Sequence, residues 1–169
     1  MANGLRVEPL GATHDRTAFS CGVPILDKYL RELATQDIRR RISNCFVAAD
    51  GDGTIAAYYT FAAASFPLTG LSPEDAKRLP RYPMLPAGLI GRLAVDKRFQ
   101  GQRLGSALVF DAARRAASAD TAIYALVVDA KDEAAAGFYE YMGFRRFAGR
   151  ALSLYFPVAT ALKAVDGLE

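Results

Sequence analysis

The sequence predicts one α/β domain spanning residues 1–169, with a mixed central sheet flanked by helices. Strand-like and helix-like segments alternate along the chain, and no internal repeat, low-complexity segment or long linker interrupts them. A hairpin signal indicates one antiparallel pair of strands, and a strand, helix, strand succession indicates one parallel pair. A chain of 169 residues with 51% hydrophobic content is also long enough to bury a core.

The first half of the chain contains a predicted helix and a predicted β-hairpin. Apolar residues recur at helical spacing over residues 24–40, and Pro24 favours the first turn of this helix. The segments 44–50 and 54–66 are apolar and rich in residues that favour strands. The GDG sequence of Gly51–Gly53 lies between them and predicts the hairpin turn.

The middle of the chain predicts a long loop followed by a parallel crossover. Five prolines fall within residues 67–86, so we expect a loop there, with one short helix at 72–79. The apolar segments 87–95 and 121–128 predict buried strands. Apolar periodicity over 104–118 predicts the helix that connects them, and this connection makes the two strands parallel.

The last third of the chain predicts one more helix and one more strand. The helix covers 132–144 and is stopped by Gly143, because glycine is the usual residue just beyond a helix C-terminus. The strand covers 150–158. These elements complete a sheet that contains both parallel and antiparallel neighbours.

The net charge of +3 is small, but the basic residues are concentrated in two places. Arg39, Arg40 and Arg41 close the first predicted helix, where basic residues at a helix C-terminus are also favourable without any ligand. The segment from residue 77 to residue 103 carries seven basic residues against Asp96 alone: Lys77, Arg78, Arg81, Arg92, Lys97, Arg98 and Arg103. The two clusters together favour an anionic ligand, with nucleic acid among the candidates.

The two cysteines and the single histidine argue against a metal site. Cys21 and Cys45 have no partner at metal-ligand spacing, and His14 is the only histidine, so we expect both cysteines to be small core residues. The sequence shows no signal-like start and no apolar run near 18 residues. We therefore expect a protein without a membrane segment that works in a reducing cytoplasm.

The turn between the strand 87–95 and the helix 104–118 combines glycine with basic charge. Gly101 and Gly105 precede and open the helix, whose N-terminus carries partial positive charge and unpaired N–H groups. Such turns bind phosphate groups, and the nearby basic residues favour a phosphate further. A tight connection with exposed basic residues is the alternative that the stretch alone leaves open.

This turn and a later segment resemble the two signature motifs of the GNAT family of N-acetyltransferases. The phosphate motif of that family, Q/R-x-x-G-x-G/A, falls on residues 100–105, and Arg103 stands where the middle glycine is usual. Arginine keeps the backbone N–H and adds a charge, but it disfavours a left-handed backbone conformation. The second motif, AxxFYxxxGF, is matched by Ala135, Phe138, Tyr139, Gly143 and Phe144.

The resemblance implies a GNAT fold with acetyl-coenzyme A as the cofactor. It places the pyrophosphate on Gln100, Gly101, Gln102, Arg103, Leu104, Gly105 and Ser106. It places the thioester arm along the backbone of Leu93, Ala94 and Val95, as an added strand would lie. It also implies that the Tyr139 hydroxyl gives a proton to the leaving thiolate, whereas a core aromatic at helical spacing is the alternative interpretation of Tyr139.

A longer resemblance covers roughly residues 15–158 and points to the TacT-type toxin acetyltransferases of bacterial toxin–antitoxin pairs. It includes the pattern F-x-C-G-x-x-x-L-D-x-Y-L, formed by Phe19, Cys21, Gly22, Leu26, Asp27, Tyr29 and Leu30. This resemblance implies acetylation of the free α-amine of aminoacyl-tRNA, a block of translation, a homodimeric enzyme and neutralisation by a ribbon-helix-helix antitoxin.

The chemistry of the amine supports the same substrate. The strand 87–95 holds no carboxylate that could act as a general base, and His14 is remote in the sequence. At pH 7 a lysine amine is only about 0.04% neutral, whereas an α-amine is about 14% neutral, so an enzyme without a strong base acetylates an α-amine more easily. The basic residues predicted to contact tRNA phosphates are Arg39, Arg40, Arg41, Lys77, Arg78, Arg81 and Arg92.

Two other functions remain open from the sequence. The first is acetylation of a small-molecule amine or a protein lysine by the same chemistry. The second is a non-catalytic module that binds coenzyme A or another anion and has lost turnover through Arg103. The retained Gly101, Gly105 and Tyr139 argue against this second possibility.

Overall fold

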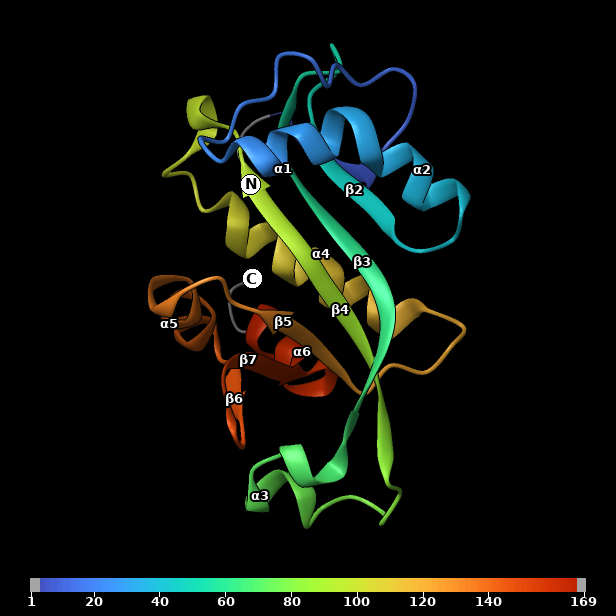
Figure 1. Cartoon of the computed structure of the whole chain (residues 1–169), viewed down its shortest axis with the longest axis vertical. Coiled ribbons are helices and arrows are strands. Elements are labelled where there is room, and N and C mark those ends of the chain that lie inside the picture. The colour runs from blue at the N-terminus through green and yellow to red at the C-terminus, as the bar shows by residue number, and fades with distance from the viewer. Residues whose placement is uncertain (1–3, 167–169) are drawn as a thin grey trace. The chain divides into compact units, whose positions relative to one another are not determined.

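The computed structural model describes residues 4–166 and contains one seven-stranded mixed sheet (Figure 1). The strand order is β1-β2-β3-β4-β5-β7-β6. The pairs β1/β2, β2/β3, β5/β7 and β6/β7 are antiparallel, and β4/β5 is parallel, which confirms the predicted α/β class and both predicted pairings. The strands are β1 (Arg6–Pro9), β2 (Asn44–Ala49), β3 (Ile55–Pro67), β4 (Met84–Val95), β5 (Ala125–Asp129), β6 (Arg145–Phe147) and β7 (Arg150–Pro157).

Six α-helices accompany the strands over the described part of the chain. They are α1 (Pro24–Lys28), α2 (Ala34–Arg39), α3 (Pro73–Ala76), α4 (Leu104–Ser118), α5 (Glu133–Met142) and α6 (Val158–Asp166). A π-helical segment, Tyr29–Leu33, joins α1 to α2, and 3₁₀ turns cover Leu68–Gly70 and Lys97–Phe99. Within residues 4–166, no helix is both long enough and apolar enough to cross a membrane.

The chain divides into two compact units. Unit 1 comprises residues 1–62 and 91–111, and unit 2 comprises residues 63–90 and 112–169. The strands β3 and β4 and the helix α4 each continue from one unit into the other. The single domain over residues 1–169 remains a prediction.

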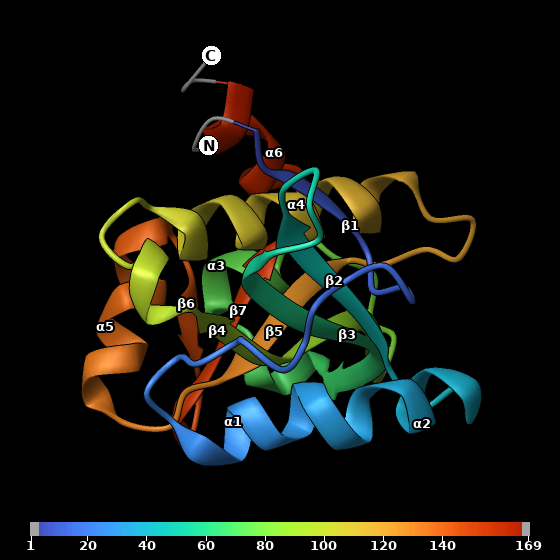
Figure 2. The same cartoon turned by 90° about the horizontal axis from the view of Figure 1, so that it is seen from above.

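In unit 1, neighbouring tyrosines of β3 face opposite sides of the sheet. The Tyr58 hydroxyl donates to the Leu26 carbonyl of α1 over 2.7 Å, whereas the Tyr59 hydroxyl donates to Asp111 Oδ2 of α4 over 2.6 Å. The α1 helix and the start of α4 therefore cover opposite faces, because side chains alternate along a strand (Figure 2). The core beneath α1 and α2 contains Phe19, Tyr29, Leu30, Ala34, Cys45, Val47, Ala49, Ile55, Tyr58 and Ala94.

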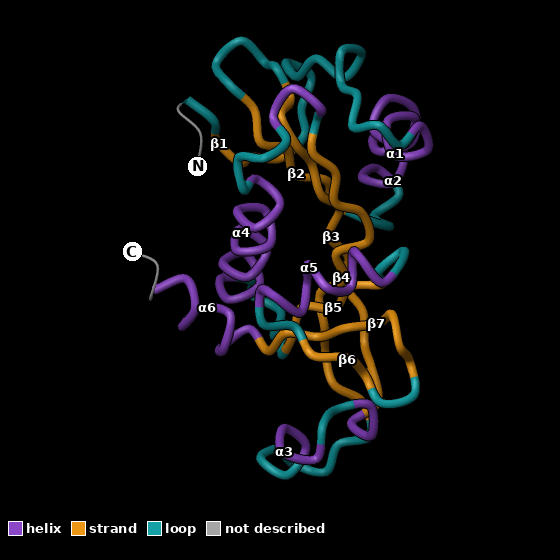
Figure 3. Tube along the Cα trace, turned by 90° about the vertical axis from the view of Figure 1, so that its left-hand side faces the viewer, coloured by secondary structure: helices purple, strands orange, loops and turns teal. Residues whose placement is uncertain are grey.

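In unit 2, the long loop between β3 and β4 is packed and anchored. The Tyr155 hydroxyl donates to Asp75 Oδ2 over 2.7 Å and accepts from the Ser72 N–H over 3.0 Å. Ser72 also caps α3, which is shorter than the predicted helix 72–79 (Figure 3). Apolar residues from the loop and from the strands share one core: Phe66, Leu71, Leu85, Ala87, Ala125, Phe147 and Tyr155.

Three elements were not predicted from the sequence, and each depends on contacts with distant residues. Strand β1 lies along β2, and β6 has only three residues, paired with β7. Helix α6 begins at Val158, the last residue of the predicted strand 150–158, directly after Pro157 at the end of β7. Short or half-buried elements of this kind lack the periodicity that identifies longer ones.

The predicted helix 24–40 is present, but its hydrogen-bonding pattern changes in the middle. The Ala34 N–H donates to the Tyr29 carbonyl, five residues back, which defines a π-helical turn. Tyr29 and Leu30 are buried at the start of this turn, and Ala34 is buried at its end. The extra residue in the turn lets both ends of the helix keep an apolar face toward the core.

Candidate functional site: a glycine-containing turn and a half-buried tyrosine

The predicted cofactor turn lies in unit 1, between β4 and α4. Asp96 follows the last residue of β4 and caps the 3₁₀ turn of Lys97–Phe99. Beyond it, Gly101 has φ +84° and Arg103 has φ +60°, so both adopt the left-handed conformation. Arg103 therefore takes up the backbone conformation that glycine would adopt most easily, despite its side chain.

The turn has the features that a diphosphate requires. The Arg103 carbonyl accepts from the Ala107 N–H over 3.2 Å, so the helix begins here and the N–H groups of its first turn point out of its N-terminus. No acidic residue lies in the first turn of α4, and the Arg103 side chain is exposed. A Cβ placed on Gly101 would meet no atom within 4 Å, so the space beside the turn is open. The residues present therefore fit the pyrophosphate of acetyl-coenzyme A.

The basic residues of the turn have different environments. The Arg98 guanidinium is held by Asp96, with Nε 2.9 Å from Oδ1 and Nη2 3.2 Å from Oδ2. This contact raises the pKa of Arg98 through the side-chain hydrogen bond and the charge of Asp96. The charge of Arg98 is thus largely balanced within the protein, whereas Lys97 and Arg103 are exposed cations beside the turn.

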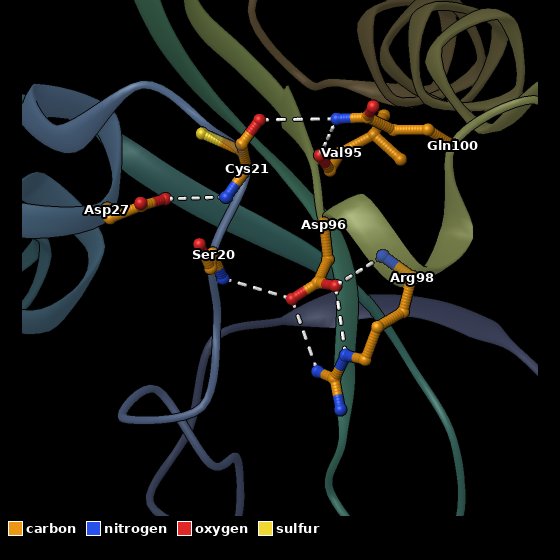
Figure 4. Close-up of polar contacts among 7 residues, drawn as sticks. All are labelled: Ser20, Cys21, Asp27, Val95, Asp96, Arg98 and Gln100. Carbon is orange, nitrogen blue, oxygen red and sulfur yellow. Dashed lines mark hydrogen bonds and ion pairs between the residues drawn. The ribbon is translucent and has the colours of Figure 1, made fainter.

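The Gln100 side chain is directed at the protein backbone (Figure 4). Its Nε2 donates to the Cys21 carbonyl over 3.2 Å and to the Val95 carbonyl over 3.0 Å. Any contact of Gln100 with the cofactor would therefore use its main chain. The cofactor roles of Gln100, Gln102, Leu104, Gly105 and Ser106 remain predictions.

The strand residues predicted to lie along the thioester arm end at this turn. Ala94 is buried in the core of unit 1, and Leu93 and Val95 are half-buried. The Val95 carbonyl already accepts one hydrogen bond from Gln100, and a carbonyl oxygen has a second lone pair. Arg92, on the same strand, stacks its guanidinium over the Tyr29 ring, with Cζ 3.6 Å from the ring centroid.

Tyr139 lies in unit 2 on α5, with its ring among aromatic neighbours. The ring makes edge-to-face contacts with Phe138 at 5.1 Å and with Phe144 at 5.3 Å between centroids. Burial raises the pKa of Tyr139 to about 12, so the hydroxyl stays protonated at neutral pH. A protonated phenol is the form that a proton donor requires.

Both ends of α5 are fixed by residues of the second motif segment. Asp132 caps the N-terminus by accepting from the Ala135 N–H over 2.8 Å, so this carboxylate already has a structural role. Gly143 ends the helix with φ +119°, and the Phe144 N–H returns to the Tyr139 carbonyl over 3.1 Å. A Cβ on Gly143 would lie 2.9 Å from Cζ of buried Phe156, so both the positive φ and the lack of space favour glycine here.

The buried carboxylates of unit 1 are engaged in structural contacts. Asp96 accepts from the Ser20 N–H, the Arg98 N–H and the Arg98 guanidinium. Burial alone would raise the pKa of Asp96, but the hydrogen bonds from Arg98 and Ser20 outweigh it and hold the pKa below its ordinary value. Asp27 accepts from the Cys21 N–H. Neither carboxylate is placed as a strong base.

The thiols do not have the environment of nucleophiles. Cys45 is buried in the core of unit 1, and burial raises its pKa to about 12. Cys21 is half-buried against the same core, and its pKa is also raised by burial and by Asp27. The prediction of a small core residue is confirmed for Cys45, whereas Cys21 lies half-buried at the edge of that core.

The residues predicted to contact tRNA are divided between the two units. Lys77, Arg78 and Arg81 are exposed on the anchored loop of unit 2, and Arg39–Arg41 are exposed at the end of α2 in unit 1. Arg41 has φ +59°, and the chain reverses there through bonds from the Arg41 and Ile42 N–H groups to α2 carbonyls. Arg41 and Arg103 are the two non-glycine residues with positive φ within the described chain.

Sequence patterns did not identify Asp96 and Ser20 as site residues. Asp96 is 1% exposed and lies directly beneath the cofactor turn, where it binds the main chain of Ser20, 76 residues away. One signal was present, because Asp96 is the single acidic residue within the basic segment 77–103.

Comparison with known proteins agrees with this geometry. Residues 41–146 match the acetyltransferase (GNAT) domain family. The chain is 36% identical over 132 residues to a tRNA-acetylating toxin of Mycobacterium tuberculosis (strain ATCC 25618 / H37Rv), covering 77% of this chain and 78% of that protein.

Two solved structures show the same fold over nearly the whole chain. The toxin AtaT complexed with acetyl-methionyl-tRNAfMet has a TM-score of 0.85 and 30% identity, covering 97% of this chain and 98% of that one. A tyrosine-to-phenylalanine mutant of AtaT, bound to the C-terminus of the antitoxin AtaR and to acetyl-CoA, has a TM-score of 0.80 and 25% identity, covering 96% and 99%.

Proposed function

Because the chain belongs to the GNAT family of acetyltransferases, we propose that it is a toxin that transfers the acetyl group of acetyl-coenzyme A to the α-amine of aminoacyl-tRNA. The 36% identity with a tRNA-acetylating toxin over 77% of this chain is the main support for aminoacyl-tRNA as the substrate. Acetylation of that amine blocks its use in peptide-bond formation and so inhibits translation.

The cofactor binds at the turn before α4 and along the end of β4. The main chain of residues 100–106 would hold the pyrophosphate at the helix N-terminus, and exposed Arg103 would add a charge-assisted contact. The backbone of Leu93–Val95 pairs with the amide groups of the thioester arm. When bound, the cofactor supplies an activated acetyl carbonyl.

Tyr139 supplies the proton that the leaving group requires. The neutral amine forms the new C–N bond, the C–S bond breaks, and the Tyr139 hydroxyl gives its proton to the sulfur. Solvent takes the proton released by the amine and restores the phenol. The raised pKa of Tyr139 keeps the hydroxyl protonated at the near-neutral pH values at which the α-amine becomes neutral.

An α-amine is the expected acceptor of the acetyl group, because the buried carboxylates already accept hydrogen bonds from the protein and do not serve as a general base. Asp96 and Asp27 are held by backbone and guanidinium donors, so neither is placed to take a proton from a charged lysine. An α-amine is neutral in useful amounts at pH 7 without such a base. The residues that we assign to tRNA phosphates are those predicted from the sequence: Arg39, Arg40, Arg41, Lys77, Arg78, Arg81 and Arg92.

The proposal extends to assembly and regulation. The chain works in the cytoplasm as a homodimer and is neutralised by a ribbon-helix-helix antitoxin. The AtaT structure with the C-terminus of its antitoxin supports an antitoxin partner for this chain as well.

Labelled acetyl-coenzyme A tests the substrate directly. We expect label to appear on the amino acid of a charged tRNA pool, with uncharged tRNA as a competitor and with lysine peptides and polyamines as parallel substrates. Higher salt should raise the apparent KM for tRNA more than it lowers kcat, because phosphate contacts are weakened by salt. Efficient labelling of lysine peptides or polyamines with charged tRNA unlabelled would replace this proposal with a small-amine or lysine acetyltransferase.

A further inference from the structure

The cofactor turn is held in place by an N-terminal segment far away in the sequence. Ser20–Gly22, called here the anchor segment, crosses the end of β4 next to residues 96–100 (Figure 4). The Ser20 N–H donates to Asp96 Oδ2 over 3.0 Å, and the Lys97 N–H donates to the Ser20 carbonyl over 2.8 Å. One residue of the anchor segment thus binds the start of the turn in both directions.

The next residue of the anchor segment binds the far end of the turn. The Cys21 carbonyl accepts from Gln100 Nε2 over 3.2 Å, and the same nitrogen donates to the Val95 carbonyl over 3.0 Å. Gln100, the residue directly before Gly101, therefore connects the anchor segment to the last residue of β4. Any shift of Cys21 would be transmitted to the backbone that leads into the phosphate site.

The anchor segment is itself fixed to the body of unit 1. Phe19, directly before it, is buried in the core and contacts Tyr58 edge to face at 5.5 Å. Asp27 of α1, also buried, accepts from the Cys21 N–H over 2.9 Å. Gly22 has φ +94°, and a Cβ there would lie 3.2 Å from Cε of Lys97, so the segment turns away at this point in close contact with the cofactor turn.

These contacts give a physical reason for the pattern F-x-C-G-x-x-x-L-D near the N-terminus. Phe19 and Asp27 fix the segment, Cys21 provides the carbonyl for Gln100, and Gly22 allows the chain to leave next to Lys97. The pattern lies about 75 residues before the turn that it supports.

We propose that Asp96 and Gln100 are positioning residues that use the anchor segment to hold the pyrophosphate-binding backbone in its binding conformation. The inference rests on the proposed use of acetyl-coenzyme A and adds a role that neither side chain performs by touching the cofactor. Asp96 organises the start of the turn through Ser20 and Arg98, and Gln100 organises its end through Cys21 and Val95. Because this backbone is already ordered before binding, the protein loses less conformational entropy when the cofactor binds.

Gln100→Met is the sharpest variant, because it keeps the length of an exposed side chain, removes the amide that bonds both carbonyls and changes no charge. We expect the Kd for acetyl-coenzyme A, measured by calorimetry, to rise about 5- to 10-fold, and KM to rise with it while kcat stays within about twofold. The salt dependence of Kd should match that of the wild type, because no charge changes. Gln100→Arg, which keeps N–H donors in the side chain but adds a charge, should bind with near wild-type affinity at high salt, where the added charge is screened.

Controls separate positioning from stability. Gln36→Ala removes an exposed glutamine from α2 and should leave both Kd and the melting temperature unchanged. Asp96→Asn should weaken cofactor binding, whereas Asp50→Asn, which alters another aspartate that accepts two backbone N–H groups in unit 1, should affect stability only. If Asp96→Asn fails to fold, the Gln100 variants still decide the question.

The outcomes distinguish this inference from the proposed function. A wild-type protein that binds no acetyl-coenzyme A would overturn both. Wild-type binding with an unchanged Kd in Gln100→Met would overturn the positioning role alone. A loss of thermal stability in Gln100→Met equal to that of Asp50→Asn, with no specific loss of cofactor affinity, would also overturn it, because it would make Gln100 a purely structural residue.

Discussion

Replacing Arg103 by glycine tests how the cofactor turn balances backbone strain against charge. Arg103 has φ +60° at the position where GNAT proteins usually have glycine. The substitution removes a guanidinium from the turn and relaxes its backbone at the same time. We therefore expect Arg103→Gly to make the protein more stable and to weaken its binding of acetyl-coenzyme A.

The size of both effects follows from the geometry. A non-glycine residue in the left-handed region costs about 1–2 kcal/mol, and the extra freedom of glycine in the unfolded chain offsets about 0.5–1 kcal/mol of the relief. The net gain of about 0.5–1 kcal/mol should raise Tm by about 1–4 °C in a chain of this size. One exposed phosphate contact contributes about 1 kcal/mol after solvent screening, so Kd should rise about 5-fold.

Arg41→Gly provides a matched control. Arg41 has φ +59° just beyond the end of α2 and is also an exposed arginine, but it lies outside the cofactor turn. Thermal unfolding should show a similar gain for both variants, because both relieve the same strain. Calorimetry with acetyl-coenzyme A at low and high salt should show weaker binding and a shallower salt dependence for Arg103→Gly only.

Two results would refute this reasoning. Unchanged cofactor affinity and salt dependence in Arg103→Gly would mean that the guanidinium does not contact phosphate. Equal losses of affinity in Arg103→Gly and Arg41→Gly would mean that the effect arises from net charge rather than from the turn.

Three further predictions concern α5. Tyr139→Phe should lower acetyl transfer by about 100-fold while cofactor binding persists, and a near wild-type rate would remove Tyr139 from the mechanism. In the wild type, kcat/KM should rise up to about pH 8 as the amine deprotonates. It should then stay level to pH 10, because the Tyr139 pKa of about 12 keeps the hydroxyl protonated. A decline already complete at pH 10 would contradict this. Gly143→Ala should destabilise the folded protein by about 2–3 kcal/mol, because alanine disfavours the positive φ and its Cβ would overlap Phe156. Gly149→Ala, which also has positive φ but open space around it, should cost only about 1 kcal/mol. Denaturant titration of both variants checks the difference.

Local patterns were sufficient for much of the fold. The hairpin turn at Gly51–Gly53, the crossover helix α4 and the stop of α5 at Gly143 were all predicted and are present. Each depends on the period of apolar side chains or on a residue that tolerates an unusual φ. Such signals are contained within a few neighbouring residues, so a single sequence displays them.

The environments of the basic residues in the cofactor turn could not be predicted from local patterns. The sequence identified Gly101 and Arg103, but it treated Lys97, Arg98 and Arg103 as equivalent cations. The structure shows Arg98 held by Asp96 and leaves Arg103 exposed in a left-handed conformation. Whether a charge is balanced depends on the fold around it, which the spacing of basic residues does not report.

By itself, the sequence determined the α/β class, the order of the long elements and the glycine turn before α4, and its resemblance to the GNAT family predicted Tyr139 as the acid. Only the tertiary structure decided that Ser20 and Cys21 support this turn, that Asp96 is buried beneath it and that β1 and β6 exist. The physical reason is the range of the interactions. Backbone preference and side-chain period act between neighbours, whereas a hydrogen bond between residues 76 positions apart forms only once the core has brought their backbones together.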